Sequence, residues 1–340
     1  MKLKHFITVV AVIVTLSVLG ISIQSNAYEK YACDRECLVD FMKQYLNALV
    51  KHDPKAVPFA GEVKFVENTA NIPVGKGLWI TASALPTDFQ IYAADPEAQQ
   101  VACLVMMKEN GNDILLGARL KLEDEKIREA EHLVIRDLGS SPFGKMGLNN
   151  LKTPRPGLLE DVPEAQRMPR WKLMEMGRTY YEALTKEDGT LAPFAKECER
   201  HENGMVTAGG KPPKLTPNAD MSEETKKMME AMAVADPSSR TCEGQISTGS
   251  FAYISEIRDR RVLIADQQKG LAVGISMFYH DSTLKEYPYK KPNGEIEMRP
   301  SYQGTFNLPA MHFFKIRNGK IYEIEAIGFQ LPYGTKSGWE

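Results

Sequence analysis

The sequence has no excess of positive charge. Its 340 residues contain 42 Lys and Arg against 44 Asp and Glu, which gives a formal net charge of −2. Binding to nucleic acid depends on a basic surface that attracts phosphates over a long range. We therefore do not expect nucleic acid as a partner.

The sequence also lacks the short motifs of several enzyme classes. No G-x-S-x-G elbow, P-loop, H-E-x-x-H or G-x-G-x-x-G occurs in the context that each motif requires. The glycine-containing segment PVGKGLW is too short for a P-loop and predicts a turn before Trp79. No set of ligands recurs at metal-binding spacing, so no metal is expected.

Only the N-terminus carries an apolar run long enough to act as a targeting or membrane segment. Lys2 and Lys4 precede the apolar residues 6–23, and Ser25-Asn26-Ala27 supplies the small residues that stand before a cleavage site. We predict that residues 1–27 are a signal peptide that directs an extracytoplasmic, periplasmic or secreted protein, with no stable membrane insertion after cleavage. Alternatively, the run is long enough to remain as a membrane anchor.

Cysteine is scarce, with five residues in the chain. Cys33 and Cys37 stand four apart, and Cys198 and Cys242 flank a polar stretch, so two disulfides are predicted outside the cytoplasm. Cys103 lies in the apolar sequence VACLVM and is expected to be a buried free thiol. The C-x3-C spacing differs from the usual C-x2-C, which disfavours the alternatives of metal binding or redox catalysis.

The sequence does contain an internal repeat. Residues 45–68 and 180–203 are identical at eleven of twenty-four positions, without a gap, at an offset of 135. The similarity returns at offsets of 171 and 194, in the pairs Ala94-Asp95 and Ala265-Asp266 and in the I-x-E-x-E sequences that start at Ile127 and Ile321. Positions shared by both copies mostly report the fold, whereas positions changed in one copy are better candidates for a specialised site.

Each copy predicts one helix followed by a series of strands. Apolar residues recur every three or four positions over 38–49 and over 171–184, which is typical of an amphipathic helix. Strand patterns follow at 62–67, 89–93, 100–108, 114–122 and 126–135, and at 198–202, 260–265, 272–280, 310–317 and 320–330. No helix separates the strands, so the order indicates an α+β fold with antiparallel strands.

The repeat also predicts the domain boundaries. We expect a first domain at 28–137, a linker rich in Gly and Pro at 138–167, and a second domain at 168–340. The growing offset places insertions in the second domain at about 204–240 and 281–305. These insertions are expected to form either a cover over a site or plain surface loops.

Three segments resemble a known family: CDRECLVDFMKQYLNALVKHDP, ENT followed by GKGLW, and QLPYGTKSGW. They are similar to secreted fungal and bacterial proteins of the domain-of-unknown-function 8021 family. The element order is similar to the NTF2-like (SnoaL-like) superfamily, in which a bent antiparallel sheet wraps around a helix and leaves a pocket. The resemblance implies two tandem NTF2-like cone domains. It further implies a pocket that is either enzymatic, often without a cofactor, or only binds or dimerises, so no cofactor is expected and a homodimer is compatible with it.

The first candidate site is a repeated Glu-Asn pair. Glu67-Asn68 and Glu202-Asn203 close the first strand of each copy, and His201 precedes only the second pair. A carboxylate beside an amide and an imidazole can supply a general base, an orienting group and a proton shuttle. Alternatively, Asn begins a turn and Glu satisfies nearby backbone donors.

Two further histidines belong to the second copy alone. His312 stands where the first copy has Ala118, and His280 stands where it has Glu109. A single His beside aromatic residues is commonly a packing residue. Three histidines gained in one copy favour a site in that copy.

Two other patterns carry charge. Glu323 and Glu325 alternate onto one face of the last strand, where a carboxylate facing a cavity would have a raised pKa. The sequence FAYISEIRDRR predicts a strand that brings Tyr253 near Arg258, a combination suited to an anionic or sugar-like ligand. The alternative for both patterns is a surface on which carboxylates pair with Arg or Lys.

These patterns together predict a small-molecule pocket in the second copy. The leading hypothesis is a cofactor-independent lyase, such as a dehydratase, or an isomerase, in which His201 or His312 is the base and Glu202 or Glu325 its partner. The candidate ligand-binding residues are Glu67, Asn68, Trp79, Asn203, Tyr253, Arg258 and His280. The rival hypotheses are a binding protein that holds a hydrophobic or sugar-like ligand between the cones, and a structural protein whose cones are filled by side chains.

Overall fold

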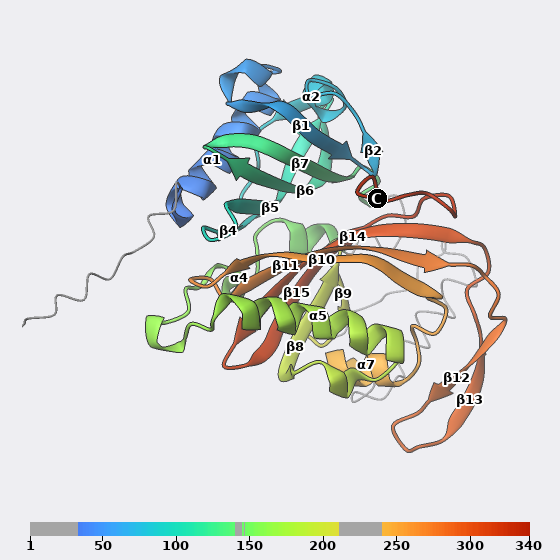
Figure 1. Ribbon diagram of the computed structural model, residues 1–340. Coiled ribbons are helices and arrows are strands. Elements are labelled where there is room, and N and C mark those ends of the chain that lie inside the picture. The colour runs from blue at the N-terminus through green and yellow to red at the C-terminus, as the bar shows by residue number, and fades with distance from the viewer. Residues whose placement is uncertain (1–32, 140–144, 146, 211–239) are drawn as a thin grey trace, which may run out of the picture. The chain divides into compact units, whose positions relative to one another are not determined.

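The computed structural model describes residues 33–139, 145, 147–210 and 240–340 (Figure 1). The expected signal peptide and residues 211–239 of the first insertion lie outside this range. Residues 31–340 form one unit. Among the described residues, no helix has the length and apolar character needed to cross a membrane.

The first half opens with helix α1 (Arg35–Val50). Asp34 caps its N-terminus, because the Asp34 carboxylate accepts a hydrogen bond from the backbone N–H of Cys37 at 2.9 Å. The apolar positions predicted from the sequence, among them Leu38, Met42 and Tyr45, are buried against a sheet. The 3-10 helix η1 (Pro54–Ala56) follows α1.

The first sheet contains seven strands. They are β1 (Phe59–Glu67), β2 (Ala70–Asn71), β3 (Ala82–Ala84), β4 (Gln90–Asp95), β5 (Gln100–Glu109), β6 (Asn112–Glu123) and β7 (Lys126–Ile135). Their order is β2-β1-β7-β6-β5-β3, and β4 also pairs with β5. The β1–β7 pair is parallel, whereas the other pairs are antiparallel. A short helix, α2 (Leu78–Thr81), stands between β2 and β3.

The segment between the sheets contains short helices rather than plain coil. These are η2 (Leu148–Leu151), α4 (Pro156–Leu159) and η3 (Glu164–Gln166). Leu151 and Leu158 are buried in a core cluster that includes residues of both sheets. The segment expected to be a linker therefore contributes to the packing.

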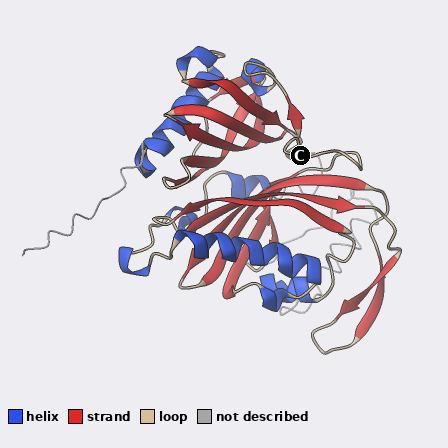
Figure 2. Ribbon diagram, viewed as in Figure 1, coloured by secondary structure: helices blue, strands red, loops and turns tan. Residues whose placement is uncertain are grey.

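The second half opens with helix α5 (Arg170–Lys186), which lies along one face of its sheet (Figure 2). The sheet comprises β8 (Phe194–Glu202), β9 (Met205–Ala208), β10 (Glu256–Asp266), β11 (Leu271–His280), β14 (Phe306–Arg317) and β15 (Lys320–Gly328). Its order is β10-β11-β14-β15-β8-β9, and β8–β15 is its parallel pair. Two short helices, η4 (Gly189–Leu191) and α7 (Cys242–Ser247), complete this half. The α+β class predicted from the sequence is confirmed.

The two sheets share a register around their parallel strand pairs. In each sheet, a Glu at the end of the first strand pairs with a residue on the last strand. On its other side, that same residue pairs with a residue on the strand that precedes the last one in the sequence. The pairs are Glu67–His132 and Ala118–His132 in the first sheet, and Glu202–Ala326 and His312–Ala326 in the second. These positions are related by the sequence offsets of 135 and 194.

Three apolar cores hold these elements. One lies between α1 and the first sheet, and a second lies between α5 and the second sheet. The third joins the opposite faces of both sheets, with Ile91 and Leu104 on one side and Val273 and Phe313 on the other. Burial on both faces explains why β5 and β11 are apolar along most of their length instead of alternating.

Both predicted disulfides are present, Cys33–Cys37 and Cys198–Cys242. Cys103 is a buried free thiol, as expected, and burial raises its pKa to about 12. This thiol is therefore protonated and unreactive at neutral pH.

Two sequence expectations need correction. The strand predicted over 251–261 begins only at Glu256, because Gly249 and Phe251 accept backbone hydrogen bonds that close turns at this point. Phe251 and Ile254, three residues apart, both pack on the second core, which a strand would not allow. The antiparallel arrangement predicted from the sequence does not hold throughout, because β1–β7 and β8–β15 are parallel pairs. The insertion at 281–305 contains a hairpin, β12 (Glu286–Lys290) and β13 (Ile296–Pro300).

Candidate functional site

A cavity of about 140 Å³ lies in the second half, on the side of the sheet that α5 covers. Its aromatic lining comes from Tyr180, Phe251, Tyr253, Phe278 and Phe306. The charged, amide or imidazole side chains that line it, among the described residues, are Glu202, Asn203 and His312. Four residues predicted from the sequence, these three and Tyr253, are therefore brought together.

Strand β8 positions Glu202 at the mouth of this cavity. The Glu202 carboxylate forms an ion pair with Arg200, whose Nε lies 3.0 Å from Glu202 Oε1, and the Glu202 side chain is 43% exposed. Arg200 is buried and also donates to Gln245 on α7 at 2.5 Å. Sequence reasoning missed Arg200, although comparison of the copies could have found it, because a guanidinium there replaces Phe65 of the first copy.

Asn203 serves the backbone instead of facing a ligand. It has a left-handed φ of 48°, which asparagine tolerates well, and it begins the turn after β8. Its side chain donates to Gly328 O at 2.8 Å and accepts from Gly328 N at 3.1 Å. Asn68 makes the same pair of bonds with Val134. The repeated Asn is therefore a structural link between the first and last strands of each sheet.

His312 is buried deep in the cavity wall. Its Nδ1 lies 3.2 Å from the Tyr181 hydroxyl, and its ring stacks on Phe314 with centroids 5.6 Å apart. Burial, helped by the positive charge of Arg200, lowers the pKa of His312 to about 3. The imidazole is therefore neutral at pH 7. A base with so low a pKa is a weak proton acceptor, which favours a hydrogen-bonding role.

His201 and Glu325 lie on the other face of the sheet, because His201 is adjacent to Glu202 and side chains alternate along a strand. His201 Nε2 lies 2.6 Å from Glu199 Oε1, and its Nδ1 lies 3.3 Å from Glu325 Oε1. Arg155 also binds Glu325, at 3.0 Å. Burial lowers the pKa of His201, but the bonds to the two carboxylates outweigh it and raise the pKa above its ordinary value.

A family model described as a domain of unknown function, DUF8021, matches residues 166–328. We refer to this matched segment as the DUF8021 domain. The resemblance noted in the sequence is thereby confirmed for the half of the chain that holds the cavity. A comparison with curated proteins finds no match.

Solved structures similar to this chain include proposed polyketide cyclases from several bacteria. Those from Silicibacter sp. TM1040 and Xanthomonas campestris pv. campestris are 13% and 15% identical, with TM-scores of 0.27 and 0.26. The matches cover 49% and 46% of this chain and 93% and 90% of those proteins. A proposed SnoaL-like polyketide cyclase from Jannaschia sp. CCS1 is 9% identical, with a TM-score of 0.27 over 48% of this chain and 89% of its own. Similarities at these TM-scores do not bear on the activity of this chain.

Two other predicted residues of the DUF8021 domain stand behind or outside the cavity. Both ring nitrogens of His280 face backbone carbonyls, those of Tyr253 and Tyr302, so His280 supports the wall that Tyr253 forms. Arg258 is exposed and pairs with Glu256 at 2.6 Å. The surface alternative therefore describes Arg258 better than a ligand contact does.

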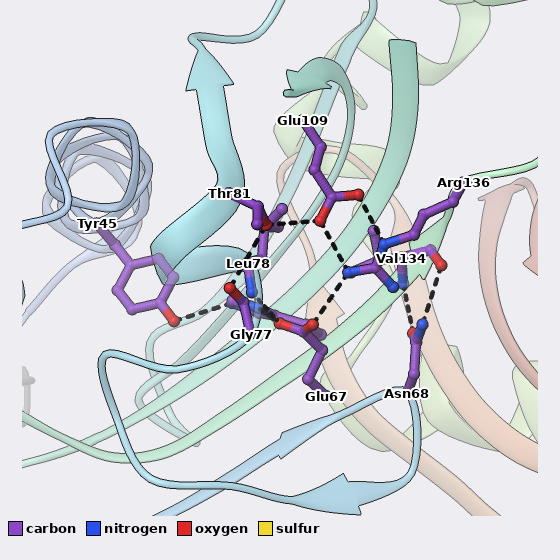
Figure 3. A network of polar contacts seen from close by, with 10 residues as sticks. Tyr45, Glu67, Asn68, Gly77, Leu78, Thr81, Glu109, Val134 and Arg136 are labelled. Atoms are coloured by element: carbon purple, nitrogen blue, oxygen red, sulfur yellow. Dashed lines mark hydrogen bonds and ion pairs between the residues drawn. The ribbon is translucent and has the colours of Figure 1, made fainter. Parts of the chain in front are cut away.

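In the first half, Glu67 is enclosed by protein groups (Figure 3). Its Oε2 accepts from the backbone N–H of Leu78 at 2.9 Å and lies 3.4 Å from His132 Nδ1, and its Oε1 accepts from Arg136 at 3.1 Å. Burial raises the pKa of Glu67, but these bonds outweigh it, so the pKa lies below its ordinary value. The Tyr45 hydroxyl lies 2.9 Å from His132 Nε2 and completes the network.

Trp79 fills the space beside this network. It is 2% exposed, and its ring packs edge-on against Tyr45 with centroids 5.2 Å apart. Gly77, two residues before Trp79, has a φ of 62°, and a Cβ there would come within 2.7 Å of the Glu67 carboxylate. Only glycine allows this close approach. Trp79 and Glu67 were both predicted to contact a ligand. In this half their side chains contact buried protein groups instead.

Proposed function

We propose that the DUF8021 domain binds a small, largely apolar molecule in the cavity beneath α5. The observation that carries this proposal is an aromatic-lined cavity with few polar groups, where a tryptophan fills the corresponding space of the first half. A cavity of about 140 Å³ resembles in size the ~150 Å³ engineered cavity that binds benzene. The ligand would therefore insert one or two rings.

We also propose that the chain consists of two tandem NTF2-like cone domains, at 28–137 and 168–340. The sequence similarity at offsets of 135, 171 and 194 and the shared register around each parallel strand pair support this organisation. In this view, the first domain is the filled copy and the second is the open one.

The proposed site of action is outside the cytoplasm, after removal of residues 1–27. Two disulfides in one chain support this location, because disulfides persist in oxidising compartments.

Proton transfer in the same cavity is a second candidate function, as a lyase or isomerase. Glu202 favours it, because this half-buried carboxylate lines the cavity and is held in place by Arg200. Because the pKa of His312 is low, we assign the role of proton acceptor to Glu202 and that of orienting the substrate to His312. Under this hypothesis Glu202→Gln would abolish turnover of an identified substrate while leaving its binding in place.

Calorimetric titration of the mature chain with cyclohexane, toluene and indole tests the binding proposal. We expect saturable binding that Ala310→Phe abolishes, since Ala310 lines the cavity and a phenyl ring would fill it. Ile80→Ala is the matched control, because Ile80 is an apolar residue 58% exposed on α2. Equal binding by the Ala310→Phe variant, or no binding of any probe, would contradict the proposal.

A further inference from the structure

In the first half the Trp79 side chain fills a space that corresponds to the cavity of the second half. Tyr180, Leu184 and His312 line the cavity. Their counterparts at offsets of 135 and 194 are Tyr45, Leu49 and Ala118, and all three belong to the core that also contains Trp79. At the offset of 171 the counterpart of Trp79 is Ser250, whose side chain is much smaller.

From this contrast we infer the chemistry of the ligand, in an inference that rests on the proposed function. The ligand is a flat aromatic molecule that packs edge-on against Tyr180 and carries an N–H or O–H group that donates to Glu202. In this account the ring of the ligand corresponds to the Trp79 ring of the first half, and its N–H or O–H group corresponds to the backbone N–H of Leu78.

The aromatic part of the inference follows from the rings that line the cavity. In the first half Tyr45 packs against Phe59, with centroids 6.4 Å apart, and against Trp79. The corresponding pair in the second half, Tyr180 and Phe194, is retained with centroids 6.5 Å apart. Tyr180 also packs against His312 and Phe314, with centroids 5.3 and 5.2 Å apart, and it borders the cavity together with four other aromatic side chains. Edge-to-face ring pairs are favourable beyond the area they bury, so an aromatic ligand gains more than an aliphatic one.

The hydrogen-bonding part follows from the two carboxylates. Glu67 accepts from the Leu78 N–H and from Arg136, and is buried. Glu202 has Arg200 as its partner among the described residues, through Oε1, and its side chain remains 43% exposed. A ligand that covers Glu202 without a hydrogen-bond donor would remove water from the carboxylate and leave this charged group without a new hydrogen bond. The carboxylate also disfavours an anionic ligand at this position.

Titration of the full mature chain with indole, 1-methylindole and 3-methylindole tests this inference. We expect indole and 3-methylindole to bind, and 1-methylindole to bind about tenfold or more weakly, because its nitrogen has lost the proton. The 3-methyl isomer controls for the added volume. In Glu202→Gln the preference for indole over 1-methylindole should shrink, since a neutral amide oxygen accepts more weakly than a carboxylate.

The outcomes separate this inference from the proposal on which it rests. Binding of cyclohexane as tight as that of indole, or equal binding of indole and 1-methylindole, would overturn the inference and leave a non-selective apolar cavity. A preference for indole that survives unchanged in Glu202→Gln would overturn the role of Glu202. The absence of binding by every probe would overturn both.

A second measurement uses the filled half. Trp79→Ala should lower the melting temperature, and indole should restore part of the loss, because the ring would re-enter the space that Trp79 leaves. If Trp79→Ala does not fold, Trp79→Leu leaves a smaller gap and should show a smaller restoration. A variant that folds and gains nothing from indole would overturn the equivalence between Trp79 and the ligand.

Discussion

His201 and His312 stand in opposite electrostatic environments, although both are absent from the first copy. His201 lies between two carboxylates that raise its pKa against the effect of burial. His312 lies among aromatic rings, and burial lowers its pKa to about 3. Sequence comparison identified both as changed positions, but the sign of each shift depends on neighbours that only the fold brings together.

Removal of His201 should change the pH dependence of stability. Its folded-state pKa lies above the ordinary value of 6.5, so the protonated imidazole stabilises the fold fully below about pH 6.5, and this contribution is lost as the pH rises through the folded-state value. The difference in free energy of unfolding between the wild type and His201→Asn should therefore shrink as the pH rises above about 6.5. Urea unfolding at each pH measures it.

His312→Asn is the matched control for this series. Because His312 is neutral throughout that range, its loss should cost the same free energy of unfolding at each pH. A difference that stays constant for His201→Asn as well would show that the carboxylates do not hold a charged imidazole.

Alternation along β8 explains which part of the site the sequence could predict. His201 and Glu202 are neighbours in a strand, so the period of two already places them on opposite faces. The exchange of Phe65 for Arg200 was likewise visible in the repeat. By contrast, the filling role of Trp79 depends on how α2 turns toward Glu67, and no sequence pattern specifies that direction.

The disulfide between Cys198 and Cys242 links β8 to α7 and so supports the cavity. It fixes the start of α7, on which the side-chain oxygen of Gln245 accepts a hydrogen bond from Arg200. Arg200 in turn holds Glu202 at 3.0 Å. The strand predicted at 198–202 lies within β8, whereas the strand predicted at 251–261 was wrong up to Glu256, where turns interrupt it.

Loss of this disulfide should cost more stability than loss of the other one. The Cys198–Cys242 bridge spans 44 positions and constrains the unfolded chain by about 4 kcal/mol. The Cys33–Cys37 bridge spans 4 positions and should contribute about 2 kcal/mol. Chemical denaturation of the two double Cys→Ser variants measures both. Equal losses, or a larger loss for the shorter loop, would contradict this account.

The two sheets exchange equivalent contacts across the core that joins them. Asp95 accepts from Arg170 at 2.7 Å, and Asp266 accepts from Arg35 at 2.9 Å. Each Asp also accepts a backbone N–H from the Ala-Asp segment of the other sheet. Such reciprocity is characteristic of the interface of a twofold dimer, here formed within one chain. A homodimer of this protein would therefore need a different surface.

Disruption of one of these contacts should destabilise the whole molecule. Asp95→Ala leaves Arg170 and a buried N–H without their acceptor, and should lower the free energy of unfolding by about 3 kcal/mol or more. Glu97→Ala is the control, because Glu97 reaches the same Arg170 at 3.5 Å but is 58% exposed, and its loss should cost less than about 0.5 kcal/mol. Similar losses for both variants in thermal or chemical unfolding would show that the interface does not depend on the buried pair.

The location of a bound aromatic probe tests the central claim, that the DUF8021 domain holds the binding site, most directly. Anomalous scattering from 5-bromoindole in crystals of the mature protein would place the ligand without reference to activity. The account predicts bromine in the cavity bordered by Tyr180, Glu202 and His312. Bromine beside Trp79 in the first half, on the exposed β12–β13 hairpin, or nowhere at saturating concentration would contradict it.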